Sequence, residues 1–150
     1  MGKKHIVEKS AEEVLAEGSK VEKTLAQIAP SLKKKSVNTA AIHILSSYNN
    51  TKMTLTDMQG NVLLAQSAGR VGFKGSKKGT SFAASKVAQA IGEAIVALNA
   101  KEVEIIVKGV GAGRESALRS LSTQGINITK VKDRTPIPHG GCRPKKPRRA

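Results

Sequence analysis

The residues of this sequence best placed to do chemistry are cations set among glycines between positions 67 and 80. Arg70, Lys74, Lys77 and Lys78 lie in the stretch S-A-G-R-V-G-F-K-G-S-K-K-G-T, which contains no acidic residue. Its four glycines allow the backbone to approach a partner closely. Cations beside an accessible backbone are suited to phosphate, so the pattern predicts a phosphate-facing loop. The alternative is an ordinary flexible surface loop.

A second glycine-rich turn, G-V-G-A-G-R at 109–114, raises the question of nucleotide binding. A dinucleotide-binding turn has the pattern G-x-G-x-x-G, but the position three residues after Gly111 is Arg114. The loop at 67–80 likewise lacks the P-loop pattern G-x-x-x-x-G-K-[ST]. The carboxylates have no spacing that marks a metal site or an acid–base pair, and one cysteine, Cys142, allows no internal disulfide. We therefore predict no enzymatic activity, cofactor, metal or small-molecule substrate.

The composition points to a polyanionic partner. Lys and Arg number 26 against 11 Asp and Glu, which gives a formal net charge of +15 and a pI of about 10.3. Nucleic acid is the expected partner of such a chain. A membrane is not expected, because the chain has no Trp and no apolar run of spanning length. The amino-terminal residues lack an apolar signal segment, so we expect a cytoplasmic protein.

The chain is predicted to have three parts. Residues 1–36 form a peripheral N-terminal helical arm. The helical part of this arm begins with an S-x-x-E capping box at Ser10 and ends near Pro30. Residues 37–133 form an α/β body, and residues 134–150 form a basic extended tail. Four prolines in the tail reduce the entropy lost when it is ordered on a partner. A charge run of this kind is also often a solvated, disordered end, and this alternative stays open.

The body is predicted to begin with three antiparallel strands at 37–46, 52–57 and 62–67, joined by turn sequences. A helix follows, capped by Thr80 or Ser81 and extending to about residue 98, with one apolar face. Small residues on this face and a glycine at position 92 indicate that the helix lies close against a sheet.

The second half of the body alternates strands with a helix. A strand is expected at 103–108, then a short helix that ends near Gly125 and directs Ala117, Leu118 and Leu121 inward, then a last strand at 126–131. The order β-β-β-α-β-α-β predicts an α/β fold with a mixed five-stranded sheet in a three-layer domain.

Four stretches together resemble one known family. They are S-S-Y-N-N-T at 46–51, S-A-G-R-V-G-F-K-G at 67–75, V-K-G-V-G-A-G-R-E at 107–115 and D-R-T-P-I-P-H-G-G-C-R-P at 133–144. In this order and spacing the chain is similar, over about residues 37–150, to the bacterial form of universal ribosomal protein eleven of the small subunit. The resemblance implies binding to small-subunit ribosomal RNA in the platform, beside neighbouring platform proteins, the messenger RNA exit channel and the transfer RNA exit site.

The resemblance also implies which residues contact RNA. Those in the body are Asn49, Asn50, Arg70, Lys74, Lys77, Lys78 and Arg114, and those in the tail are Arg134, His139, Arg143, Lys145, Lys146, Arg148 and Arg149. The two asparagines could equally cap their turn. With only three aromatic residues, recognition is expected to use phosphate and ribose contacts rather than a platform of stacked bases. A DNA-binding protein is the competing hypothesis, although no helix-turn-helix or zinc pattern is present.

The sequence departs from the family pattern at three positions. Gly140 stands where the family usually has Asn, and Val110 and Ser81 stand where it often has Pro. None of these changes removes a cation, so RNA binding is still expected. The arm at 1–36 matches no pattern of the family, and its partner is not implied.

Overall fold

The computed structural model describes residues 37–143 and 145–146, in which a three-stranded meander leads into two strand–helix–strand units. The predicted helical arm at 1–36, and Arg148 and Arg149 of the tail, lie outside the described residues. The elements are β1 (Thr39–Ser47), β2 (Asn50–Asp57), β3 (Val62–Ser67), α2 (Ala68–Val71), the 3₁₀ helix η2 (Gly75–Gly79), α3 (Ser81–Ala97), β4 (Glu102–Lys108), α4 (Gly113–Thr123) and β5 (Ile128–Asp133).

The five strands form one mixed sheet in the order β3-β2-β1-β4-β5. The pairs β1–β2 and β2–β3 are antiparallel, whereas β1–β4 and β4–β5 are parallel. The predicted α/β class, mixed five-stranded sheet and order of elements are therefore confirmed. The last strand begins two residues later than predicted, because residues 124–127 form the turn that follows α4.

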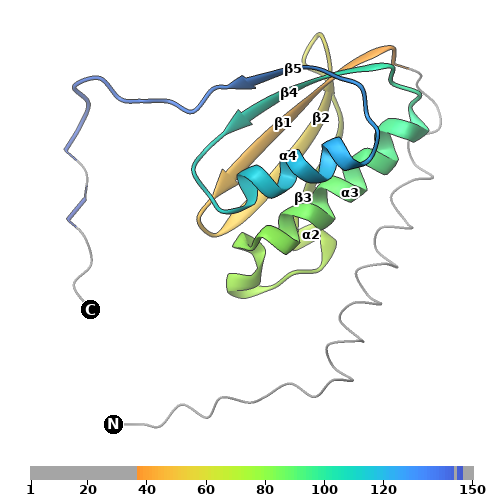
Figure 1. The fold of residues 1–150 in the computed structure, drawn as a ribbon. Helices are drawn as coiled ribbons and strands as arrows, with labels where there is room; N and C mark the ends of the chain where they lie inside the picture. The colour runs from red at the N-terminus through yellow and green to blue at the C-terminus, as the bar shows by residue number, and fades with distance from the viewer. Residues whose placement is uncertain (1–36, 144, 147–150) are drawn as a thin grey trace, which may run out of the picture.

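Both long helices cover the same face of the sheet (Figure 1). The connections β3–α3–β4 and β4–α4–β5 each join parallel strands, and both move in the same direction across the sheet. Such crossovers are right-handed in nearly all proteins, so two that move in one direction place their helices on one side. The described residues therefore form two layers, which differs from the predicted three-layer domain, and the opposite face of the sheet is left without a helix.

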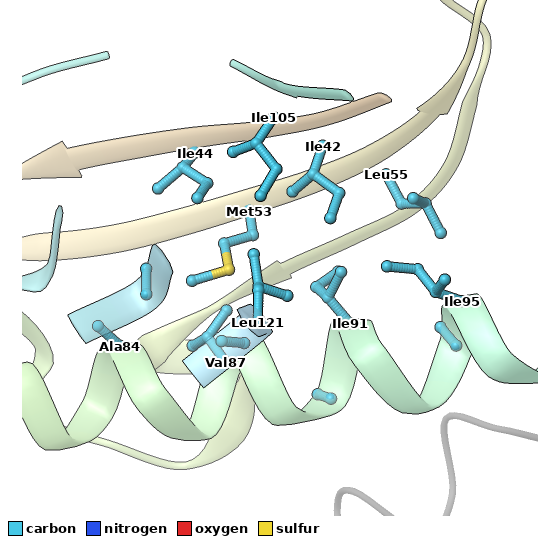
Figure 2. Packing of buried hydrophobic residues seen from close by; sticks show 14 of the residues in the cluster. Ile42, Ile44, Met53, Leu55, Ala84, Val87, Ile91, Ile95, Ile105 and Leu121 are labelled. Carbon is cyan, nitrogen blue, oxygen red and sulfur yellow. The ribbon is translucent and has the colours of Figure 1, made fainter. Parts of the chain in front are cut away.

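The core lies between the sheet and these helices. Along β1, Ile42 and Ile44 point to the helices and are buried, whereas His43 and Leu45 point to the opposite face and are partly exposed. Figure 2 shows the buried side chains of the sheet meeting Val87, Ile91 and Ile95 of α3, and Leu121 of α4. The period-2 pattern of the strands and the helical period of α3 thus converge on one apolar layer.

The glycine in the middle of α3 has a different purpose from the one predicted. A Cβ atom on Gly92 would lie 1.4 Å from the side-chain oxygen of Gln124, just after α4. The missing side chain at Gly92 therefore makes room for Gln124 at the end of α4, and not for the sheet. The N-cap of α3 is Thr80, whose hydroxyl accepts a hydrogen bond from the Ala83 amide at 3.3 Å.

The β4–α4 turn lies directly against the end of β1. A Cβ on Gly109 would be 2.0 Å from the Ser46 carbonyl oxygen, and one on Gly111 would be 2.3 Å from that of Ser47. The Gly111 amide donates to the Ser46 carbonyl at 3.2 Å. Gly109 also has a φ of 101°, a region in which side chains are strained. Glycine at positions 109 and 111 therefore allows the β4–α4 turn to pack against the end of β1, where the β1–β2 turn begins.

We expect Gly109→Ala to destabilise the fold more than Gly125→Ala. Gly125 also has a positive φ, of 70°, but open space surrounds its Cα. Alanine there should cost only the backbone strain of about 1–2 kcal/mol. At position 109 an overpacking cost of about 1–3 kcal/mol adds to that strain. Urea-induced unfolding of the free protein measures both losses, and equal losses would contradict this account of the turn.

Candidate nucleic-acid interface

Several predicted RNA-binding segments meet at one end of the sheet, where β1, β4 and β5 finish and the tail leaves (Figure 1). At this end Gly79 of η2 lies so close to the β1–β2 turn that a Cβ would be 2.4 Å from the Tyr48 carbonyl oxygen. The Ser81 hydroxyl donates to the Ala112 carbonyl at 3.3 Å, which links α3 to the β4–α4 turn. The tertiary structure thus brings together segments that are more than 80 residues apart in the sequence.

The loop at 67–80 is folded into two short helices. Ser67 caps α2 by accepting a hydrogen bond from the Arg70 amide at 3.3 Å, and Gly72 ends α2 in the left-handed conformation with a φ of 116°. The Phe73 ring then meets the Phe82 ring edge-on, with centroids 5.9 Å apart. These contacts attach the loop to the start of α3, so its cations have defined positions.

The four loop cations differ in their surroundings. The Arg70 guanidinium donates to the Ala65 carbonyl at 3.1 Å, which directs this side chain back along β3. Lys74 and Lys77 are exposed. Lys78 is partly buried, and its stem lies 3.6 Å from the position that a Cβ on Gly69 would occupy. Three of the four cations, Arg70, Lys74 and Lys77, are therefore exposed at the surface of the loop.

The loop glycines satisfy internal requirements that the sequence did not reveal. Gly72 and Gly75 have positive φ values of 116° and 56°, and Gly79 fits against the backbone of Tyr48. The prediction that these glycines let the loop approach a partner is untested. Positive φ at Gly72 and Gly75, and the lack of space for a Cβ at Gly79, explain the residue type at three of the four positions.

The two predicted asparagine contacts have different positions in the first turn. Asn49 is exposed at the tip, whereas Asn50 begins β2 and is partly buried. The turn is held by Ser47, whose hydroxyl donates to the Asn50 carbonyl at 3.0 Å and accepts from the Asn50 amide at 3.2 Å. The side-chain oxygen of Asn50 is buried without a hydrogen-bond partner. Asn49 is thus the better placed of the two for contact with RNA.

Arg114 was predicted to contact RNA, but the structure gives its guanidinium internal partners. It donates to the Gly109 carbonyl at 3.0 Å and to the Thr135 hydroxyl at 3.2 Å, and it forms an ion pair with Asp133 at 2.6 Å. Arg114 therefore connects the β4–α4 turn to the residues that follow β5. We call the group formed by Arg114, Asp133 and Thr135 the tail clasp.

Thr135 completes the tail clasp. Its hydroxyl donates to Asp133 at 2.6 Å and accepts from the Gly109 amide at 3.1 Å, and the Arg134 amide donates to the Val107 carbonyl at 2.8 Å. The first residues of the tail are consequently fixed to the body. That Thr135 and Asp133 fix the tail to the body was not predicted from the sequence. A possible signal was the presence of Arg114 in one turn and of the acidic and hydroxyl residues of D-R-T at 133–135, which can form an ion pair and hydrogen bonds with it.

The tail clasp is electrostatically favourable at neutral pH. Hydrogen bonds from the Arg114 side chain, and then from the side chain and backbone of Thr135, lower the pKa of Asp133 well below its ordinary value of 3.8. Because the folded protein favours the ionised carboxylate, this stabilisation is complete above that ordinary value and is lost as the pH falls through the lower folded value. Acid should therefore weaken the tail clasp, because protonation of Asp133 weakens its charge-assisted hydrogen bonds with Arg114 and Thr135.

Beyond the tail clasp the predicted tail contacts are open to solvent. His139, Arg143, Lys145 and Lys146 are all exposed, as is Arg134 at the start of the tail. Gly140 has a φ of 65°, in the left-handed region that Gly and Asn adopt most easily. This conformation explains how glycine can replace the asparagine usual at this position in the family that the sequence resembles.

Among residues 37–143 and 145–146, no group of three or more His, Cys, Asp and Glu side chains is placed to hold a metal ion. No helix within the same residues is long and apolar enough to cross a membrane.

A mixed α/β sheet that presents basic turns and a basic tail at one end has the features of a nucleic-acid-binding protein. The sequence model of the family described as Ribosomal protein S11 matches residues 40–149, and the chain belongs to that family. It is accordingly a structural protein of the small ribosomal subunit that binds ribosomal RNA, and its family is not a family of enzymes.

We expect Asp133→Ala to weaken binding to ribosomal RNA, although it makes the protein more positive. Loss of the carboxylate removes the ion pair with Arg114 and the hydrogen bonds from Thr135, so the start of the tail is held less firmly. Ordering even one backbone residue again on binding costs about tenfold in affinity. Glu102→Ala is the matched control, because it removes an exposed carboxylate at the far end of β4. Titration with a small-subunit ribosomal RNA fragment measures both variants. If the two variants bind equally tightly, the tail clasp does not position the tail.

Proposed function

We propose that this chain binds small-subunit ribosomal RNA in the platform through the basic end of its sheet and its tail, beside the messenger RNA exit channel and the transfer RNA exit site. The observation that carries the proposal is the meeting of the β1–β2 turn, the loop at 67–80 and the start of the tail at one end of the sheet. Neighbouring platform proteins and nearby messenger RNA are the further partners.

Contacts to phosphate and ribose support this function better than base stacking. Phe73 and Phe82 pack edge-on against each other, and the Lys86 ammonium lies 6.0 Å from the centre of the Phe82 ring. Two of the three aromatic rings therefore already have partners within the protein. Lys74 and Lys77 of the same loop are exposed at the surface, where their positive charges suit a phosphate backbone.

The tail supplies the most extended part of the proposed interface. Its cations alternate with prolines, which fix the backbone and reduce the entropy lost on binding. Because the tail clasp sets the direction in which the tail leaves the body, these cations should reach one site on the RNA rather than provide diffuse attraction.

Replacement of Lys74, Lys77 and Lys78 by Ala should weaken binding to a platform fragment of ribosomal RNA without unfolding the body. Each lost phosphate contact should reduce the slope of log affinity against log salt by about 0.7–0.9, so the triple variant should lose about 2–3 units of slope. A salt titration with circular dichroism as the folding control makes this measurement. Unchanged affinity and slope would show that the loop does not bind RNA.

Truncation after Pro136 tests the tail while it keeps the tail clasp intact. It removes five cations of the tail, namely Arg143, Lys145, Lys146, Arg148 and Arg149. If about half of them contact phosphates, the slope should fall by about 2 units. We expect a larger loss on the platform fragment than on an unrelated RNA of equal length. Equal losses on both would show that the tail provides charge without placement.

The position in the platform is tested by chemical footprinting of small subunits assembled with and without this protein. Protection should concentrate in platform RNA near the messenger RNA exit channel. Protection confined to another region of the subunit would overturn the proposed location while it leaves binding to ribosomal RNA intact.

A further inference from the structure

The face of the sheet opposite α3 and α4 carries a row of cations that the predicted interface did not include. Side chains on this face come from alternate positions of each strand, beginning with Leu45 of β1. Leu45 pairs with Lys52 of β2 on one side and with Lys108 of β4 on the other. The side chains of these three residues therefore lie in one line across the sheet.

Arg134 extends this line beyond Lys108. Val107 pairs with Asp133 in the parallel β4–β5 ladder, and the Arg134 amide donates to the Val107 carbonyl at 2.8 Å. Because neighbouring strands are about 4.8 Å apart, Lys52 and Lys108 are separated by about 10 Å, with Arg134 about 5 Å further on. We call Lys52, Lys108 and Arg134 the cationic row. All three are exposed.

The cationic row borders one shallow hollow in the sheet face. The hollow is lined by Lys52, Lys108 and Arg134 together with His43, Leu45, Thr54 and Ile106. Leu45 at its centre is 45% exposed, which leaves an apolar spot between two lysines. The residues beside it thus offer cations, a hydroxyl and an imidazole around a small apolar floor.

Among the described residues, no acidic side chain lies in the two rows of the open face that contain Leu45 and His43. Of the acids on the same strands, Glu104 is two rows away from the cationic row and forms an ion pair with Lys132, and Glu102 lies at the far end of β4. Asp133 belongs to the tail clasp with Arg114. Among the described residues no carboxylate forms an ion pair with the cationic row, although the Glu104 carboxylate interacts electrostatically with Arg134. The positive charge of the row is therefore only partly compensated, and it points to an anionic partner.

We propose that the open face of the sheet is a second RNA-binding surface, on which a phosphate backbone of the ribosomal RNA crosses the ends of β2, β1, β4 and β5 along the cationic row. The proposal rests on the proposed function and extends it to residues outside the predicted interface. Arg134 belongs both to the cationic row and to the start of the tail, so the two surfaces are continuous.

The chemistry of the hollow favours RNA over a protein. The cores of protein–protein interfaces are depleted in charged residues, lysine among them, whereas two lysines flank Leu45 at the centre of this hollow. Among the described residues that line the hollow there is no Phe, Tyr or Trp, so contacts to phosphate and ribose, rather than extensive stacking with bases, are expected. Thr54 and His43 are placed to add hydrogen bonds to the sugar–phosphate backbone.

The test compares two pairs of substitutions that remove the same charge. Lys52→Gln with Lys108→Gln removes two members of the cationic row, and Lys101→Gln with Arg119→Gln removes two exposed cations elsewhere, before β4 and on α4. Binding to a platform fragment of ribosomal RNA is titrated against salt. We expect the row variant to lose about 1.4–1.8 units of slope, the effect of two phosphate contacts, and the control variant to lose less than about half as much.

Each other outcome has a defined meaning. Equal losses in the two variants would show diffuse attraction and overturn the proposal. If the row variant binds normally while the variant of Lys74, Lys77 and Lys78 loses affinity, the proposed function stands and the open face has another occupant, such as a neighbouring protein or the acidic segment of residues 8–22. If neither variant loses affinity, both the open-face proposal and the proposed function of the loop fail.

A crosslinking experiment tests the location directly. In a Cys142→Ser background, Leu45→Cys carries a photoreactive maleimide between the two lysines, and Arg119→Cys carries it on α4 as the control. Irradiation of assembled small subunits should join position 45, and not position 119, to ribosomal RNA. Crosslinks from position 45 only to protein would overturn the proposal.

Discussion

The close approach of the β4–α4 turn to the end of β1 is the constraint on which the rest of the interface depends. The backbones at Gly109 and Gly111 lie so near the carbonyl oxygens of Ser46 and Ser47 that no side chain fits between them. This contact fixes the first turn, and through Gly79 the first turn meets the loop at 67–80. It also places Gly109 where its amide and carbonyl can hold Thr135 and Arg114. Backbone packing at one corner thus determines where three basic segments emerge.

Charge in this protein is divided between residues that hold the fold and residues that remain available to a partner. Arg114 and Asp133 neutralise each other within the tail clasp, and Lys132 does the same with Glu104. The exposed cations of the loop, the tail and the cationic row have no comparable acidic partner among the contacts of the described residues, with Lys77 left aside. Since 26 basic residues face 11 acidic ones, most of the positive charge has to be compensated from outside. An RNA backbone supplies that compensation, and its binding should weaken as salt rises.

The two-layer arrangement follows from the order of the strands and has a consequence for function. Both crossovers run in one direction across the sheet, so α3 and α4 protect one face and leave the other accessible. On the protected face the strands carry Ile42, Ile44 and Met53, whereas the side chains around Leu45 on the other face are mostly polar or charged. The same strands therefore serve the core on one side and a candidate binding surface on the other.

The sequence alone determined the order of elements, the α/β class, the family and most of the exposed cations, because these depend on periodicity, turn chemistry and motifs that are local in the chain. Only the tertiary structure decided that both helices share one face, that Gly92 receives Gln124, and that Arg114 binds Asp133 instead of standing free. It also decided that Lys52, Lys108 and Arg134 form one row. These features depend on strand register and crossover direction, which join residues 19 to 82 positions apart. No local sequence pattern predicts these contacts, because the packing of the sheet and helices decides which distant residues become neighbours.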